Sequence, residues 1–85
     1  MDEKAFINKA KEHIASVSSA AVVDMFVVWQ SKILQNNKAL ISWQGNSAVL
    51  QGLRVVDYVE VTYNGDKDEF YFDWYALEAN EVVKL

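Results

Sequence analysis

The stretch YVEVTYNGDKDEFYFDWY, residues 58–75, decides the fold. Hydrophobic and polar side chains alternate along it, on both sides of the turn-forming dipeptide Asn64-Gly65. Alternation with a period of two indicates β-strands, and two such strands joined by a turn form an antiparallel hairpin. The pattern predicts that one face of this hairpin is buried and carries Phe70, Phe72 and Trp74.

The length of the turn sets which residues lie opposite each other. A two-residue loop would place Glu60 opposite Glu69, a like-charge pair that destabilises a sheet. A four-residue loop over residues 64–67 avoids this pair and keeps apolar groups together. We therefore predict the four-residue loop, with Val61 opposite Phe70, Val59 opposite Phe72 and Thr62 opposite Glu69.

A second hairpin is predicted upstream, over residues 25–43. Its first strand alternates, and one side is apolar enough to be buried: Met25, Val27, Trp29, Ser31 and Ile33. Residues 35–38 supply turn chemistry, and residues 39–43 form the returning strand. A helix over residues 22–34 is the competing interpretation, because Val22, Phe26, Trp29 and Ile33 also have helical spacing.

The amino-terminal segment carries the clearest helical pattern. From Asp2 to Val17 the apolar residues recur every three or four positions, at Phe6, Ala10, Ile14 and Val17. Asp2 suits the N-cap of this helix. Residues 20–23 fit either a continued helix or the approach to a strand.

The remaining segments are less regular. Residues 44–54 predict a long loop that packs down at Ala48, Val49 and Leu50. The tail predicts a short helix over residues 76–79 or a strand ending on Val82, Val83 and Leu85. Together the segments predict one α+β domain over residues 1–85, with an N-terminal helix on an antiparallel sheet of about four strands from two hairpins.

Composition excludes several classes of protein. The 85 residues contain no Cys and one His, so neither a disulfide nor a zinc site stabilises the domain. The longest apolar run, residues 25–29, is too short to cross a bilayer, and Asp2 and Glu3 stand where a signal peptide has bases. We expect a cytoplasmic protein with no membrane association.

Acidic residues concentrate in the second half of the chain. Residues 57–81 hold eight acids and one base, a charge of −7 within a net charge of −4. Direct binding to nucleic acid is disfavoured there, because phosphate binding depends on cationic side chains. This segment is either a solvated hairpin or a surface for a basic partner, with Asp66, Asp68 and Glu69 as candidate contacts.

Tyrosines share the second face of the predicted hairpin with two acids. Tyr58, Tyr71 and Tyr75 lie there beside Glu60 and Asp73. Tyrosine is favoured at protein interfaces, so this face is a candidate partner or homodimer surface. Ordinary exposed cross-strand pairing and a pocket for a planar ligand are the alternatives.

No pattern of residues indicates catalysis. His13 lies at the edge of the helical apolar stripe without a nucleophile near it in sequence, and is expected to be structural. Asp57 and Asp73 could approach across the hairpin, but carboxylates on a wet sheet face are common. We expect no enzyme, no catalytic residue, no metal and no cofactor.

Two segments resemble a known family. They are FVVWQSKILQN at residues 26–36, followed by KAL, and YVEVTYNGDK at residues 58–67. They resemble small uncharacterised proteins encoded by phages and prophages of Gram-positive bacteria, although residues 43–56 depart from the shorter connection expected there. The resemblance implies an accessory protein, which we expect to bind a host or phage protein. The alternative is a nucleotide-like ligand at a homo-oligomer interface, with Arg54 or Lys32 holding phosphates.

Overall fold

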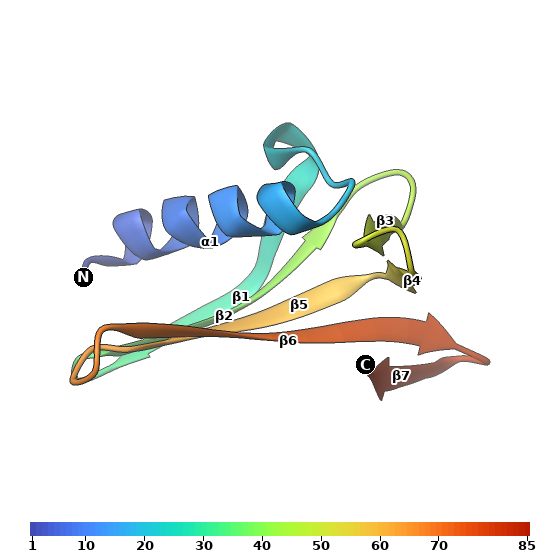
Figure 1. The fold of residues 1–85 in the computed structure, drawn as a ribbon. Helices are drawn as coiled ribbons and strands as arrows, with labels where there is room; N and C mark the ends of the chain where they lie inside the picture. Colours follow the sequence, from blue (N-terminus) through green and yellow to red (C-terminus); the bar gives the residue numbers. More distant parts are fainter.

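A computed structural model describes residues 1–85 as one helix lying across one face of an antiparallel sheet (Figure 1). The five-stranded sheet has the order β1-β2-β5-β6-β7, and a separate two-stranded sheet, β3-β4, lies beside one end. The α+β prediction is confirmed, but the expectation of about four strands is wrong. The elements are α1 (Glu3–Val17), a 3-10 turn η1 (Val22–Asp24), β1 (Met25–Ile33), β2 (Asn36–Trp43), β3 (Ala48–Leu50), β4 (Arg54–Val56), β5 (Tyr58–Asn64), β6 (Glu69–Glu78) and β7 (Glu81–Lys84).

The helix begins and ends where the sequence predicts. The Asp2 side chain accepts a hydrogen bond from the Ala5 amide at 2.7 Å and caps the first turn. The Ser18 amide donates to the Ile14 carbonyl at 3.0 Å at the other end. Phe6, Ala10 and Ile14 are fully buried against the sheet, so the apolar stripe is the face that packs.

The first hairpin is a pair of strands, and the helix over residues 22–34 is wrong. Its turn is also shorter than predicted, with only Leu34 and Gln35 between β1 and β2. Asn37 belongs to β2 and is completely buried, with its side-chain amide donating to the Met1 carbonyl at 3.3 Å. Asn36, Asn37 and Lys38, which were expected in the turn, therefore belong to β2, and Asn37 is held beside the amino terminus.

A β-bulge breaks the alternation in β1. Val27 pairs with Ile41 while Trp29 pairs with Leu40, so Val28 is an extra residue. Met25 and Val27 face the helix, as predicted. Because the extra residue Val28 lies between Val27 and Trp29, the residues Trp29, Ser31 and Ile33 lie on the opposite face. Their predicted burial is wrong.

The second hairpin has the predicted faces but a different register. Val61 pairs with Phe72 rather than Phe70, and Asn64 pairs with Glu69. The loop has four residues, 65–68, because Asn64 stays in the strand and its side-chain oxygen accepts from the Asp66 and Lys67 amides at 3.0 and 3.3 Å. A shift of two residues preserves the alternation, so Phe70, Phe72 and Trp74 still face the helix.

Two other segments form hairpins where the sequence left a loop or a helix. Residues 48–56 pair as β3 and β4, with Ala48 buried as the predicted contact of this segment. In the tail, β6 continues to Glu78 and turns through Ala79 and Asn80, which adopt φ of 48° and 66°. β7 then returns along β6, so the helix over residues 76–79 is wrong and the strand alternative is observed.

The core lies between α1 and the central strands. Ile41, Val59 and Val61 are fully buried there with the helix side chains. Phe70, Phe72 and Trp74 are only partly buried, because β6 lies outside β5 and the helix covers it incompletely. The His13 ring stacks on Phe72 with centroids 4.0 Å apart.

α1 is too short and too polar to cross a membrane.

Candidate interaction surface on the open face of the sheet

The face of the five-stranded sheet opposite the helix is covered by no other element (Figure 1). We call it the open face. The register places five predicted surface residues on it together: Tyr58, Glu60, Tyr71, Asp73 and Tyr75. The side chains of neighbouring strands complete it: Trp29, Lys38, Leu40, Val82 and Lys84.

The centre of the open face is an apolar hollow. Its volume is about 240 Å³, and Glu60 is the one charged residue in a lining made of Trp29, Leu40, Tyr58, Tyr75 and Val82. Trp29 keeps 41% of its surface exposed and Val82 keeps 59%. Large apolar side chains that are exposed together make this face a candidate interaction surface.

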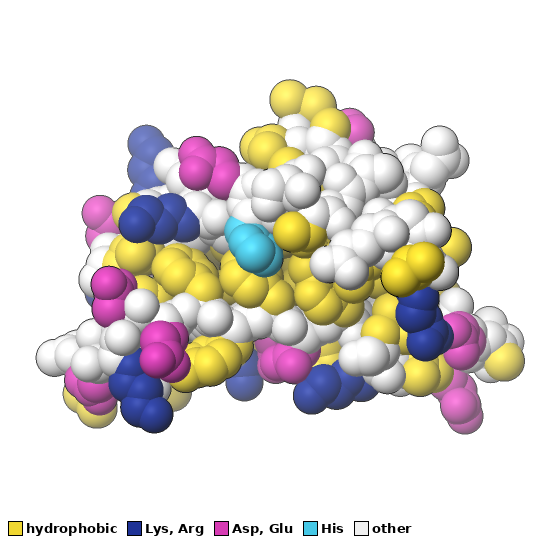
Figure 2. Space-filling model, in the orientation of Figure 1, with side chains coloured by type: hydrophobic (Ala, Val, Ile, Leu, Met, Phe, Trp, Pro, Cys, Tyr) yellow, Lys and Arg dark blue, Asp and Glu magenta, His cyan; other side chains and the backbone are white.

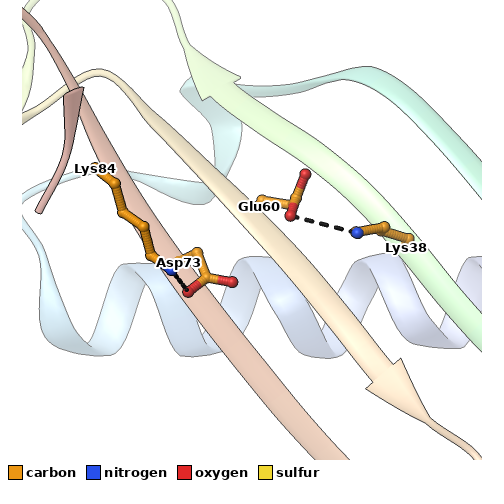
Figure 3. Close-up of polar contacts among 4 residues, drawn as sticks. All are labelled: Lys38, Glu60, Asp73 and Lys84. Atoms are coloured by element: carbon orange, nitrogen blue, oxygen red, sulfur yellow. Dashed lines mark ion pairs between the residues drawn. The ribbon is translucent and has the colours of Figure 1, made fainter. Parts of the chain in front are cut away.

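Two ion pairs neutralise the charge beside this hollow. The register puts Glu60 directly opposite Asp73, a pairing of like charges. Lys38 on β2 lies 3.5 Å from Glu60, and Lys84 on β7 lies 3.2 Å from Asp73 (Figure 3). Hydrogen bonding to Asp73 and its charge raise the pKa of Lys84. The four charges cancel, so the middle of the open face is apolar and neutral.

The predicted acids of the turn lie apart from the hollow. Asp68 accepts a hydrogen bond at 2.6 Å from Tyr63, a residue buried on the helix side. Glu69 accepts one from the hydroxyl of Tyr71. These bonds are the main reason that the pKa of each tyrosine is raised. Asp66 is exposed in the turn, so the negative charge gathers at the end of the sheet.

The residues considered for cation binding have structural partners. The Asp57 carboxylate accepts from the Ser47 hydroxyl and from the Leu77 amide, each at 2.7 Å. Asp73 is paired with Lys84. No group of three His, Cys, Asp or Glu residues is arranged to hold a metal ion.

The bases named for phosphate binding lie away from the aromatic hollow. Lys32 donates to the Met1 carbonyl at 3.0 Å, and Arg54 pairs with Glu78 at 3.6 Å. Neither lines the hollow. The nucleotide alternative therefore has aromatic side chains at this site but not the cations it was expected to use.

Sequence reasoning missed half of this surface. Trp29 was assigned to the buried side because strict alternation ignores the extra residue Val28. Lys84 was missed because the tail was read as a helix or an unplaced strand. The adjacent residues Val27 and Val28 beside Trp29 do not by themselves indicate a bulge, so the sequence contains no clear signal for it.

The fold and this surface define a class: a small α+β protein whose sheet is covered by a helix on one face and uncovered on the other. The chain belongs to a family of unknown function (DUF6275), whose model matches residues 3–85. This supports the resemblance to uncharacterised small proteins. No curated protein and no solved structure matches the chain.

Proposed function

We propose that this protein is a non-enzymatic interaction module that binds other proteins through the open face, and that its first partner is a second copy of itself. The observation that carries the proposal is the apolar, neutral centre of an uncovered sheet face. Two sheets commonly pack face to face through such surfaces, with their strands within about 30° of each other.

The area of the open face is sufficient for a dimer. Strands about 4.8 Å apart and a rise of about 3.4 Å per residue give the face a flat footprint of roughly 400 Å². With side-chain relief, two facing copies bury roughly 1,200 Å² in total, which is the lower end for specific interfaces. A dimer of moderate affinity is expected.

Charge favours one arrangement of the two copies. The acidic turns lie at one end of each sheet, and each chain carries a net charge of −4. A two-fold axis running across the strands places each acidic turn over the opposite end of its mate. Remaining repulsion between the copies is screened by salt, so the dimer tightens as salt increases.

Sedimentation of the protein at about 10 to 100 µM, in low and high salt, tests the dimer. Trp29→Arg should give a monomer that still unfolds cooperatively, with a thermal midpoint that does not depend on protein concentration, since it places a charge in the hollow. Leu53→Arg is the matched control, because Leu53 is exposed in the β3–β4 turn, away from the open face. A wild-type monomer at both salts, or a Trp29→Arg dimer, refutes the proposal.

The resemblance also supports a proposal for the biological setting. We propose a phage or prophage accessory protein, acting in the bacterial cytoplasm on a host or phage protein. A gene located among phage genes would support this origin, and a location among unrelated housekeeping genes would count against it. A thermal-shift panel of nucleotides is the counter-test: stabilisation by a nucleotide, without capture of a partner protein, favours the alternative of a ligand bound at a homo-oligomer interface.

A further inference from the structure

The outer edge of β6 is only partly paired. β7 pairs with β6 from Tyr75 to Glu78, and the Leu85 amide adds one bond to the Trp74 carbonyl at 2.8 Å. No strand pairs with the rest of this side of β6, residues 69–73, which we call the free edge. Figure 1 shows β7 running back along only one part of β6.

Backbone groups along the free edge point outward at two residues. The Trp74 carbonyl bonds Leu85, so it points away from β5. Backbone groups of alternate residues in a strand point the same way, so the N–H and C=O of Phe72 and Phe70 also point outward. No side chain bonds to them, and an unpaired strand edge is a template for another strand.

A second hollow, lined by both charged and aromatic side chains, runs beside the free edge, between the helix and β6. It has a volume of about 490 Å³ and is lined by Lys9, Glu12, His13, Phe70 and Phe72. Figure 2 shows a band of hydrophobic side chains beneath the helix, with the one histidine above it. Side chains of an added strand that point toward the helix would enter this hollow.

β7 already shows which residues suit this edge. Val83 lies opposite the buried Ala76, and Leu85 packs against the core, so both are on the helix side. Lys84 is on the open face, where it lies opposite Tyr75 and reaches Asp73 at 3.2 Å. The sequence Val83-Lys84-Leu85 thus alternates apolar, basic and apolar residues.

Lys84 pairs with the acid two residues before the one it lies opposite, and the same offset predicts the next contact along β6. A basic residue opposite Tyr71 would reach Glu69, as Lys84 opposite Tyr75 reaches Asp73. Apolar residues opposite Phe72 and Phe70 would lie beside His13 and the aromatic side chains. A second copy fits this edge poorly, because antiparallel pairing of two β6 strands about Tyr71 sets Glu69 of each copy against Asp73 of the other.

We propose that the free edge of β6 binds an extended peptide segment of a partner protein, which adds as an antiparallel strand in line with β7 and alternates apolar and basic residues. Backbone hydrogen bonds to Phe72 and Phe70 supply affinity. The aromatic side of the hollow under the helix, formed by Phe70 and Phe72, supplies specificity together with Glu69. This site is separate from the open face and does not depend on the proposed dimer.

The probe is a seven-residue peptide that alternates Val and Lys, blocked at both ends and carrying a fluorophore. It should bind saturably in fluorescence anisotropy, whereas a Val/Glu peptide of the same length should not. Amide hydrogen exchange reads out the site directly in the wild-type protein. The Phe70 and Phe72 amides should exchange rapidly in the free protein and slow by about tenfold or more with saturating peptide.

Two variants with the same change in net charge distinguish binding at the free edge from non-specific attraction of a basic peptide to an acidic protein. Glu69→Lys should weaken binding of the Val/Lys peptide about tenfold. Glu81→Lys, on an exposed residue of β7 away from the free edge, should change the affinity by less than about twofold. Thermal unfolding checks that both variants fold.

Equal weakening by both variants would mean that only net charge is sensed, and would refute the proposal. Unchanged exchange at Phe70 and Phe72 on saturation would also refute it, as would equal binding of the Val/Glu peptide. All measurements can be repeated in Trp29→Arg. Peptide binding by monomeric Trp29→Arg would support both proposals. A wild-type protein that binds the peptide as a monomer would refute only the dimer, and a wild-type dimer that does not bind the peptide would refute only the free-edge site.

Discussion

The two faces of the sheet are both rich in hydrophobic side chains, but only one is covered. Ile41, Val59 and Val61 face the helix and have no exposed surface, whereas Trp29 and Tyr71 on the open face expose 41% and 43%. The covered face gains burial from α1. The open face remains exposed to water, and it carries partly exposed aromatic rings and the ion pairs of Lys38 and Lys84. Alternation in a sequence therefore identifies two faces without indicating which one another element covers.

Truncating neighbouring residues of β2 should separate the faces most sharply. Ile41→Ala removes a fully buried side chain from the covered face and should lower the free energy of unfolding by about 2 to 5 kcal/mol. Leu40→Ala, the next residue along the chain, faces the open side and should cost about 1 kcal/mol or less. Denaturant unfolding measures both, and equal losses would contradict the assignment of the two faces.

The turn end of the central strands is the next most sensitive position. A Cβ on Gly65 would lie 2.1 Å from the Gln35 carbonyl oxygen, so the two hairpin turns would have to separate. Gly65→Ala should destabilise the protein by about 1 to 3 kcal/mol. Asp66→Ala, on an exposed side chain in the same turn, is the matched control and should be near neutral. Thermal unfolding of the pair decides whether this close approach holds the turns together.

The bulge in β1 provides a test with a small expected effect. Deleting Val28 should leave every other side chain of β1 on its present face, because Val28 is the residue without a partner. We expect a change in the free energy of unfolding within about 1 kcal/mol. Deleting Leu40, which lies in the regular pairing of β2 with β5, should abolish cooperative unfolding, since it moves Ile41 to the open face. A ΔVal28 protein that fails to fold would show that the bulge itself is required.

The smallest effects concern one tyrosine from each face. Asp68 raises the pKa of Tyr63 on the covered face, and Glu69 raises that of Tyr71 on the open face. Since the folded pKa exceeds the unfolded value, the stability from each bond is intact below about pH 10 and is lost as pH rises through the folded pKa.

A pH titration followed by NMR of the tyrosine rings measures both groups, because it resolves the four tyrosines of the chain. Asp68→Asn should lower the pKa of Tyr63 and leave Tyr71 unchanged, and Glu69→Gln should do the reverse. A shift of both tyrosines in either variant would mean that the two pairs are coupled through the turn.

Elements with local causes could be predicted from the amino-acid sequence alone. Asp2 caps the helix through an amide three residues away, and the period of Phe6, Ala10 and Ile14 selects the buried stripe. Alternation placed Tyr58, Tyr71 and Tyr75 on one face of the second hairpin and Phe70, Phe72 and Trp74 on the other. Those assignments survive an error of two residues in register, because side chains in a strand repeat every two positions.

Features that depend on segments far apart in the chain could be seen only once the strands and the helix were placed in three dimensions. Glu60 stands opposite Asp73, in a register two residues from the predicted one, and Lys38 and Lys84 reach these two carboxylates from two other strands that the hairpin alone does not include. Val28 is extra only relative to β2, and Asn37 joins a strand because it is buried beside Met1. The open face likewise exists because one helix covers one side of a five-stranded sheet, a relation between elements that no local pattern encodes.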